Sequence, residues 1–577
     1  MRERGLCGGR VAVAVVCAVL AVLAAATLQA AHPQPVRGRG GAVVCDDPQA
    51  SEAGIEMLRK GGNAVDAAVA AALALAVVYP EAGNLGGGGF AVARMGGKVS
   101  TLDFRETAPA GARPNMFLDR ENRPEPGKSL IGPLASGVPG SPAGLYELQR
   151  KLGKLPWPTV VRPAVRLARE GFTVSDQVAE DLAKHADLLR RFPETASVWL
   201  AGGKTPGAGT VMRLSQLAAL LDSYGREGPS AVMGGPAAAA IELVSRRHGG
   251  VLRAADLAAY RAVWRDPVRF KAYGWEVASM DLPSSGGIIL GETVGMLERV
   301  DWADLPRFGA DRDQLLVEAW RRAYADRYLL GDPRTTGATA ANLLAPQWLA
   351  RRAGEIGRKR ATPSQTVRAW PGGLPVESRE TTHISVADAF GNVVSLTTTL
   401  NGSFGCGLIV PGLGFLLNNE MDDFAAAPGK PNLYGLIQGR ANEVGAGKRM
   451  LSSMSPTVLW REGRLLALGS PGGSRIPTAT LQVILNVIVD GDQLQAAVDR
   501  PRIHHQWFPD RIEAEADALA PETEGELRRR GYSIWIVKGL GRVNAVQIRA
   551  DGLVEGAADP RGPGSAQVVA PPIPELR

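Results

Sequence analysis

Hydroxyl side chains alternate along two apolar segments on either side of residue 390. The segments, Thr381–Ala387 and Val393–Leu400, flank the turn-forming pentapeptide Asp388-Ala389-Phe390-Gly391-Asn392, which predicts a β-hairpin. If Ala387 faces Val393, period-2 alternation places a set of polar side chains on one face, with Thr381 opposite Thr399. The set is Thr381, His383, Ser385, Thr397, Thr399 and Asn401. Threonine also suits a plain strand, so this pattern alone leaves a structural interpretation open.

The choice of nucleophile is narrowed by what the chain lacks. It has no G-x-S-x-G motif and only six His, which disfavours a Ser-His-Asp hydrolase. An N-terminal threonine needs no histidine, because its own α-amine can act as the base. Thr381 follows a charged segment at 355–380 that contains Pro and Gly and is typical of an exposed connector. Thr381 therefore becomes a candidate nucleophile if the chain is cut before it.

A second hairpin is predicted around the two-residue turn Glu462-Gly463. Extending its register pairs Ser453 with Gly472 and Ser452 with Gly473. Two hydroxyls would then lie beside a Gly-Gly turn whose N–H groups open a helix. Such N–H groups can bind negative charge, including an oxyanion, although a plain glycine turn remains the alternative.

The preceding elements are predicted to be helices and a hairpin. Asp46-Asp47-Pro48 is a helix start, and Asn63 opens a second helix to about Val78 that is apolar on all sides and should be buried. The glycine run Gly86–Gly89 lacks a phosphate-binding pattern and indicates a close backbone crossing, followed by a hairpin with its turn at Gly97-Lys98. The section from about Lys151 to Arg352 is mainly amphipathic helix.

Composition excludes several classes of protein. The 577 residues are 45% hydrophobic and 21% charged, as in globular proteins. The net charge is +7, and the first ten residues supply +2 of it (Arg2, Arg4 and Arg10 less Glu3). The other charges are dispersed, which predicts no nucleic-acid partner. The six His and four Cys lack metal-ligand spacing, so no metal or other cofactor is expected.

Residues 1–31 are expected to be a signal peptide or signal anchor. Basic residues precede an apolar stretch from Val11 to Ala26, and small residues near Ala30-Ala31 offer a cleavage region. The stretch is short and rich in Ala, which favours cleavage over a retained anchor. The protein should therefore be exported, to a periplasmic, secreted or outer-face membrane-tethered location. Cys45 and Cys406 would remain, either paired or as two buried thiols.

Eight blocks of the sequence, in order, resemble motifs of the gamma-glutamyltransferase family. They are Asn84–Phe90 (NLGGGGF), Asp103–Glu106 (DFRE), Pro283–Gly287 (PSSGG), Tyr324–Arg327 (YADR), Glu380–Val386 (ETTHISV), Asn418–Phe424 (NNEMDDF), Leu451–Thr457 (LSSMSPT) and Gly469–Arg475 (GSPGGSR). The similarity extends from about Ala42 to about Pro560. One block alone would be weak, but eight in order are specific.

This resemblance implies an α+β fold of the N-terminal-nucleophile hydrolase type, a four-layer αββα sandwich formed jointly by two autoprocessed chains. Cleavage between Glu380 and Thr381 would give a large subunit, 32–380, and a small catalytic subunit, 381–577. The implied donor is glutathione or another γ-glutamyl compound. A γ-glutamyl-Thr381 ester would then pass to water or to the amine of an amino acid or dipeptide, without a cofactor.

The resemblance also implies catalytic roles. Thr381 is the nucleophile, its freed amine is the base, and Thr399 orients it. The N–H groups of Gly472 and Gly473 hold the oxyanion. Tyr434 lies in a segment, Pro431–Gly435, that resembles a lid over the pocket.

The α-carboxylate and α-ammonium of a γ-glutamyl group need partners once they lose water. By similarity, Arg105, Ser452 and Ser453 bind the carboxylate, a guanidinium fork with two hydroxyls. Asn401, Glu420 and Asp423 bind the ammonium.

Two other functions fit the same scaffold. A glutaryl-type (cephalosporin) acylase of this family would need no ammonium partners. A catalytically silent exported binding protein would need no nucleophile, and the intact set of Thr381, Thr399, Arg105 and Gly472-Gly473 argues against it.

Overall fold

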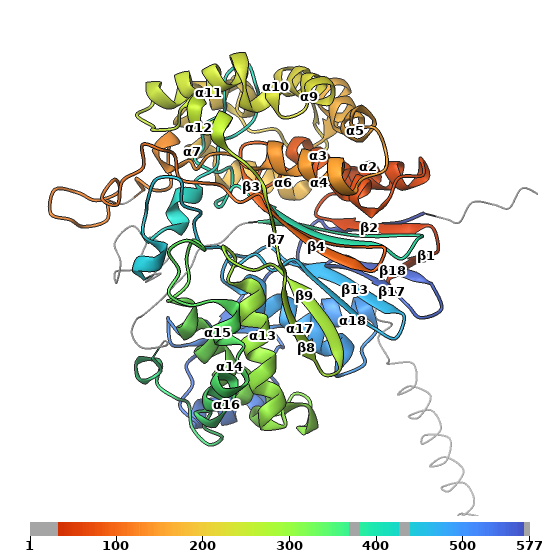
Figure 1. Cartoon of the computed structure of the whole chain (residues 1–577), viewed down its shortest axis with the longest axis vertical. Coiled ribbons are helices and arrows are strands. Elements are labelled where there is room, and N and C mark those ends of the chain that lie inside the picture. Colours follow the sequence, from red (N-terminus) through yellow and green to blue (C-terminus); the bar gives the residue numbers. More distant parts are fainter. Residues whose placement is uncertain (1–32, 126, 369–380, 426–438, 570–577) are drawn as a thin grey trace, which may run out of the picture. The chain divides into compact units, whose positions relative to one another are not determined.

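Two seven-stranded antiparallel sheets form the centre of the compact unit that begins at Pro35 (Figure 1). The computed structural model describes residues 33–125, 127–368, 381–425 and 439–569. The first sheet has the strand order β19-β2-β10-β11-β3-β4-β7. Its strands are β2 (Gly41–Cys45), β3 (Gly88–Met95), β4 (Lys98–Asp103), β7 (Val263–Arg265), β10 (Thr382–Asp388), β11 (Val393–Thr399) and β19 (Ser565–Val568).

The second sheet has the order β1-β18-β17-β13-β12-β9-β8. Its strands are β1 (Val36–Gly38), β8 (Val268–Ala272), β9 (Trp275–Ser279), β12 (Thr457–Arg461), β13 (Arg464–Gly469), β17 (Asn544–Ile548) and β18 (Val554–Ala557). The two sheets pack face to face through small and β-branched residues such as Val44, Val92, Ala467 and Val546. Such residues let two sheets approach closely over a shared core.

Helices cover the outer face of each sheet (Figure 1). On the first sheet lie α2 (Pro48–Arg59), α3 (Ala64–Val78) and α4 (Ser141–Leu152), and on the second lie α13 (Gly286–Leu297), α17 (Arg475–Ile488) and α18 (Leu494–Asp499). Further helices are α5 (Trp157–Glu170), α6 (Asp176–Lys184), α9 (Ser215–Glu227), α11 (Gly235–Arg247), α14 (Ala310–Arg327), α16 (Pro346–Gly354) and α19 (Pro521–Arg529). The predicted α+β class and its four αββα layers are therefore confirmed.

The two helices predicted near the N-terminal end are present. The Asp47 carboxylate caps α2 by accepting from the N–H groups of Gln49 and Ala50. Asn63 caps α3 in a capping box with Asp66. Every residue of α3 is buried, as its uniformly apolar sequence predicts.

The register predicted for the first hairpin is confirmed. Ala387 pairs with Val393 and His383 with Thr397, and the ladder continues to Thr382 and Thr398. Thr381 and Thr399 are thus the next residues on the two strands.

The glycine run brings backbones close together, also as predicted. A Cβ atom at Gly89 would lie 2.2 Å from the carbonyl oxygen of Thr397, and one at Gly87 would lie 2.0 Å from that of Thr399. The turn that follows is shifted by one residue from the prediction, because Met95 pairs with Lys98 and leaves Gly96-Gly97 as the turn.

The second hairpin has the predicted turn, but its extension to the serines is wrong. Arg461 pairs with Arg464, and the ladder ends where Thr457 pairs with Leu468. Pro456 cannot donate the next hydrogen bond, so the chain leaves the sheet there. Ser452 instead forms a parallel bridge with Ser284.

The middle section is mainly helical, as predicted, but it also supplies three strands of the two large sheets. Strands β7, β8 and β9 add to the edges of the two sheets. Their three to five residues are too short to show a clear alternation. Cys45 and Cys406 are buried free thiols and do not pair with each other. Among the described residues, no helix combines the length and apolarity needed to cross a bilayer.

The close approach at Gly89 predicts a strong effect of a single methyl group. Gly89→Ala should lower the free energy of unfolding by about 2 kcal/mol, because β3 must move away from β11. Gly207→Ala is the control, since a Cβ atom there meets no atom within 4 Å. Thermal unfolding of the two variants checks this, and equal midpoints would contradict the close crossing.

Candidate active site

The candidate nucleophile Thr381 lies at the open end of the β10–β11 hairpin. It is buried, with 4% of its surface exposed. Thr399 ends the neighbouring strand, and its Oγ1 accepts a hydrogen bond from the N–H of Asn401 at 2.7 Å. Asn84 Nδ2 donates to the Thr399 carbonyl at 2.9 Å, which fixes this end of β11. The hairpin therefore places two threonines at the same level of a buried sheet end.

The polar face predicted for this hairpin points toward the second sheet. His383 Nδ1 lies 2.8 Å from Thr397 Oγ1, and its Nε2 lies 3.0 Å from Ser385 Oγ. A Cβ atom at Gly469 would lie 2.5 Å from His383 Cε1, so the end of β13 packs against the ring. Burial lowers the pKa of His383 to about 3, which keeps the ring neutral. This contact brings the end of the second sheet close to the strand that follows Thr381.

Gly472 and Gly473 lie just beyond that end of β13. Their φ angles of 126° and 58° fall in the region that favours glycine. Their carbonyl groups accept from the N–H groups of Arg475 and Ile476 as α17 begins. No group in the described ranges accepts a hydrogen bond from the N–H of either glycine. The two N–H groups are thus donors at a helix start, the geometry that binds an oxyanion.

Arg105 joins the residues predicted to bind the two charges of a γ-glutamyl group. Its Nη1 contacts Glu420 Oε1 and its Nη2 contacts Asp423 Oδ2 in buried ion pairs. Glu106 Oε2 lies 3.7 Å from Arg105 Nη1. The predicted carboxylate partner and two predicted ammonium partners are therefore in contact with each other.

The protonation of this cluster follows from its burial. Desolvation raises the pKa of Glu106 to about 8, and it also raises the pKa values of Glu420 and Asp423. The positive charge of Arg105 lowers all three pKa values, but by less than burial raises them. Three carboxyl groups around one guanidinium cannot all ionise at low energetic cost. The cluster therefore holds at least one proton near neutral pH.

The other predicted binding residues lie in loops next to this cluster. Asn401 adopts a positive φ of 75°, and its Nδ2 donates to the carbonyl of Asn419 at 3.0 Å. This bond ties the end of the β11 loop to the turn that begins at Glu420. Ser452 and Ser453 are buried, and Ser452 Oγ accepts from the N–H of Met454 at 3.1 Å. Glu380 and Tyr434 lie outside the described residues, so the cleavage and lid predictions stay predictions.

Comparison with known proteins identifies the family. The profile described as Gamma-glutamyltranspeptidase matches residues 50–569. A glutathione hydrolase proenzyme of Escherichia coli is 42% identical over 532 residues, which cover 91% of this chain and 91% of that protein. The chain belongs to the gamma-glutamyltranspeptidase family. A glutathione hydrolase proenzyme of Pseudomonas aeruginosa is 40% identical and covers 92% of this chain and 95% of its own length.

A solved structure supports the same assignment of fold. The cephalosporin acylase from Bacillus halodurans superposes with a TM-score of 0.82 at 25% identity. The match covers 94% of this chain and 98% of that one. This gamma-glutamyltranspeptidase family member therefore shares its sandwich with a cephalosporin acylase of the N-terminal-nucleophile hydrolase type.

Two residues beside this site belong to the sequence motifs but had no predicted role. Glu106 belongs to the block Asp103–Glu106, and Ser285 belongs to Pro283–Gly287. Both are fully buried. Glu106 directly follows Arg105, the predicted carboxylate partner, and this adjacency is a signal that could have marked it, whereas the sequence gives no comparable signal for Ser285.

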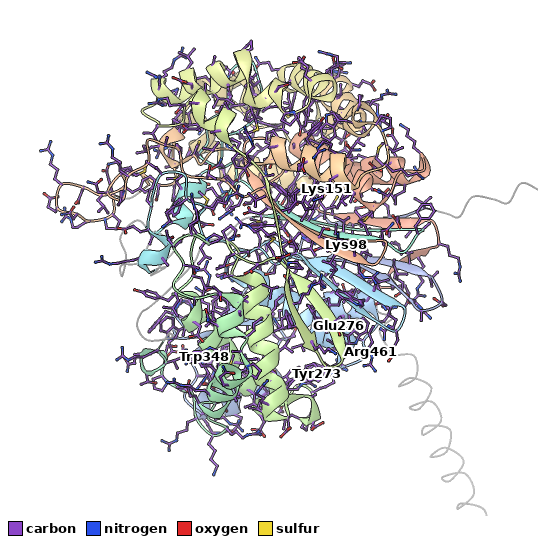
Figure 2. All side chains as sticks on the ribbon, viewed as in Figure 1. Lys98, Lys151, Tyr273, Glu276, Trp348 and Arg461 are labelled. Carbon is purple, nitrogen blue, oxygen red and sulfur yellow. The ribbon has the colours of Figure 1, made fainter. Side chains whose placement is uncertain are left out.

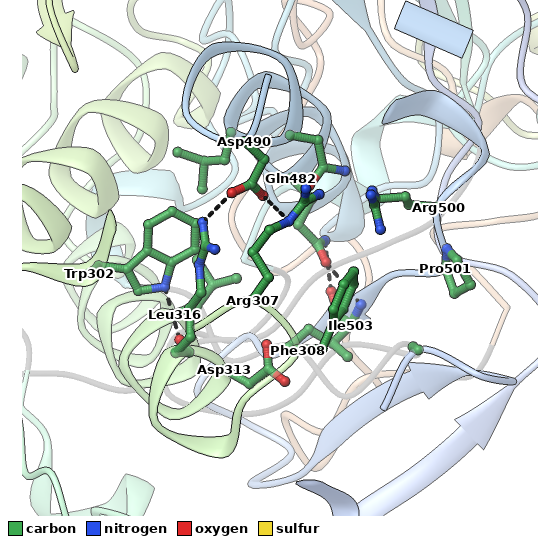
Figure 3. A pocket seen from close by; sticks show the side chains of 14 residues that line it. Trp302, Arg307, Phe308, Asp313, Leu316, Gln482, Asp490, Arg500, Pro501 and Ile503 are labelled. Atoms are coloured by element: carbon green, nitrogen blue, oxygen red, sulfur yellow. Dashed lines mark hydrogen bonds and ion pairs between the residues drawn. The ribbon is translucent and has the colours of Figure 1, made fainter. Parts of the chain in front are cut away.

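A surface hollow is lined by none of the candidate residues that the structure describes (Figure 3). Arg307, Arg312 and Arg500 line it, and they pair with Asp490 and Asp492. The charges of these arginines are therefore balanced by carboxylates of the protein itself. The pairs link the start of α14 and the loop before it with the turn that follows α17, so the hollow is not a second anion site.

The buried, neutral His383 predicts a loss of stability in acid. Its folded pKa of about 3 lies below the ordinary value of about 6.5, so unfolding takes up a proton below that pH. Its stabilising contribution is complete above about pH 6.5 and is lost as the pH falls. Between about pH 7 and pH 5, the free energy of unfolding should therefore fall by about 2 kcal/mol less in His383→Gln than in the parent protein. Unfolding midpoints at both pH values, with His248→Gln as control, check this difference.

Proposed function

We propose that the chain is an autoprocessing gamma-glutamyltransferase that cleaves the γ-glutamyl bond of glutathione and related compounds through an ester on Thr381. The placement of Thr381 beside Thr399, with the Gly472-Gly473 donors at the end of the facing sheet, supports this proposal most directly. Membership of the gamma-glutamyltranspeptidase family supports it independently.

The first step is cleavage of the chain itself. Thr381 Oγ attacks the carbonyl carbon of Glu380, the peptide C–N bond breaks, and the Thr381 nitrogen keeps the transferred proton as a free amine. Water then hydrolyses the resulting ester and leaves a carboxylate on Glu380. The products are the chains 32–380 and 381–577, and the new α-amine is the base for later turnovers.

The second step repeats this chemistry on a donor. The Thr381 amine accepts the Oγ proton while Oγ attacks the γ-carbonyl carbon, and Thr399 orients the nucleophile. Gly472 and Gly473 donate to the oxyanion, each stabilising the transition state by about 3 kcal/mol. The leaving amine takes the proton, and the γ-glutamyl ester then reacts with water or with the amine of an amino acid or dipeptide.

The buried charge cluster accounts for selection of the γ-glutamyl group. The guanidinium group of Arg105, together with Ser452 and Ser453, would bind its α-carboxylate. The carboxylates of Glu420 and Asp423, together with Asn401, would bind its α-ammonium. A zwitterion supplies both charges at once, so it can exchange with the internal ion pairs without leaving a buried charge alone. Tyr434 would close over the bound donor.

Residues 1–31 would direct export, to the periplasm, to the medium or to the outer face of a membrane. The basic start and the apolar stretch from Val11 to Ala26 support this part of the proposal. No metal, organic cofactor or nucleic acid takes part in the proposed reaction.

A glutaryl-type acylase is the second candidate, because the Bacillus halodurans cephalosporin acylase superposes well on this chain. A glutaryl group carries the carboxylate but lacks the ammonium. The buried carboxyl groups of Glu420 and Asp423 would then have no ligand charge to meet, which favours γ-glutamyl donors.

Removal of the nucleophile tests the mechanism. Purified parent protein should give two bands on denaturing electrophoresis, with Thr381 at the amino terminus of the smaller one. Thr381→Ala should give a single band and no γ-glutamyl p-nitroanilide hydrolysis, because both steps need Oγ. A single, unprocessed chain with full activity would refute the mechanism.

Removal of an ammonium partner tests donor recognition. Asp423→Asn should lower kcat/KM for γ-glutamyl p-nitroanilide by about 100-fold and that for glutaryl p-nitroanilide by much less. Asp422→Asn is the matched control, because the Asp422 carboxylate contacts Ser129. Comparable rates of the parent protein on both anilides would contradict the assigned ammonium site.

A further inference from the structure

Two of the sequence motifs have no part in the reaction described above. They are Pro283–Gly287, at the start of α13, and Tyr324–Arg327, at the end of α14. Tyr324 and Arg327 are both 2% exposed. Each reaches a different loop of the candidate site.

Tyr324 contacts the loop that carries the oxyanion donors. Its hydroxyl donates to the carbonyl of Ser474, the residue directly after Gly473. The ring meets His504 edge-on at 6.0 Å between centroids, which fixes its orientation. On the other side of the loop, the N–H of Arg542 donates to Ser470 Oγ at 2.9 Å. The segment 470–474 is therefore held at both ends.

Arg327 reaches the loop that carries the carboxylate-binding serines. Its Nε donates to Ser285 Oγ at 3.0 Å, and that hydroxyl donates onward to the Ser452 carbonyl at 2.8 Å. Because a guanidinium can only donate, Ser285 must accept from it and must direct its own proton to Ser452. The N–H of Ser285 also donates to the same carbonyl at 2.8 Å. Arg327 thus determines the hydroxyl direction that fixes the Ser452 backbone.

Asp326, which lies between Tyr324 and Arg327 in the sequence, anchors the end of α14. Asp326 accepts from Arg352 Nε at 2.9 Å and from Trp348 Nε1 at 3.3 Å, both on α16. Trp348 is labelled in Figure 2. The last turn of α14 is therefore fixed to a neighbouring helix and provides a rigid base for both contacts.

We propose that Tyr324 and Arg327 are positioning residues for the two halves of the site. Tyr324 places the Gly472-Gly473 donors, and Arg327 places Ser452 through Ser285. The two side chains lie three residues apart, so they leave the same side of α14. The inference rests on the proposed function. The Gly472-Gly473 donors act in the transition state, so Tyr324 should affect kcat, whereas Ser452 acts in substrate binding, so Arg327 should affect KM.

The first test removes the Tyr324 hydroxyl. Tyr324→Phe should lower kcat for γ-glutamyl p-nitroanilide about tenfold with KM within about twofold, because the oxyanion donors shift. It should also slow the appearance of the two processed bands. Tyr532→Phe is the matched control, since Tyr532 donates to Glu318 on the same helix at 2.7 Å. The control should lower the unfolding midpoint without changing kcat.

The second test perturbs the Arg327 relay. Arg327→Lys and Ser285→Ala should each raise KM for γ-glutamyl p-nitroanilide about tenfold and change kcat by less than about threefold. Combined, the two changes should be no worse than either one, because they break the same relay. Ser285→Ala keeps the test available if Arg327→Lys does not fold. With 4-aminobutyryl p-nitroanilide, which lacks the carboxylate but keeps the ammonium, Ser285→Ala and the parent should have equal KM; Arg327 also acts on Asp423, so Ser285→Ala is the variant that isolates the relay.

The outcomes separate this inference from the function on which it rests. Parent protein that fails to cleave γ-glutamyl p-nitroanilide refutes the proposed function. Active parent protein with an unchanged kcat in Tyr324→Phe, or with equal kcat losses in Tyr324→Phe and Tyr532→Phe, refutes the role of Tyr324 alone. Unchanged KM in both Arg327→Lys and Ser285→Ala refutes the relay.

Discussion

The register of the β10–β11 hairpin is the constraint on which the candidate site depends, and the carboxylate of Asp388 fixes it. That carboxylate accepts from the N–H groups of Phe390 and Asn392 in the turn, and from the N–H of Ala64 at the start of α3. One side chain therefore closes the hairpin and joins it to the buried helix above. A slip of one residue would turn Thr381 to the opposite face of the sheet, away from the glycine donors.

The charge cluster around Arg105 shows a different kind of constraint. Desolvating one guanidinium and several carboxyl groups is unfavourable, and the short ion pairs offset that cost only in part. Packing alone would be served equally well by apolar residues, so the cost of the cluster supports the proposal that it binds a ligand with both charges. Burial raises the pKa values of its carboxyl groups, and the ammonium of the proposed donor would lower them.

Local features were predictable from the sequence, and distant contacts were not. The turn pentapeptide and the alternation of Thr381–Ala387 specify the first hairpin, because both act over a few residues. Pro456 ends the second ladder, and the partner that Ser452 then finds, Ser284, is far away in the chain. Likewise, Arg105 and Glu420 are separated by 315 residues, so only the fold reveals that these predicted partners contact each other. For the same reason, the sequence did not decide whether Cys45 and Cys406 form a disulfide or stay as two thiols.

The position of the proposed cleavage also determines whether the products stay together. Thr381 precedes the first residue of β10, so breaking the bond before it removes no hydrogen bond of the β10–β11 ladder. If the boundary lies there, the first sheet holds three ladders between the two chains, β19–β2, β2–β10 and β11–β3, and the second holds two, β1–β18 and β12–β9. Separation of the chains would open both sheets and expose the core between them. The free energy that folds the precursor thus keeps the new amino terminus in a buried site after the covalent link is gone.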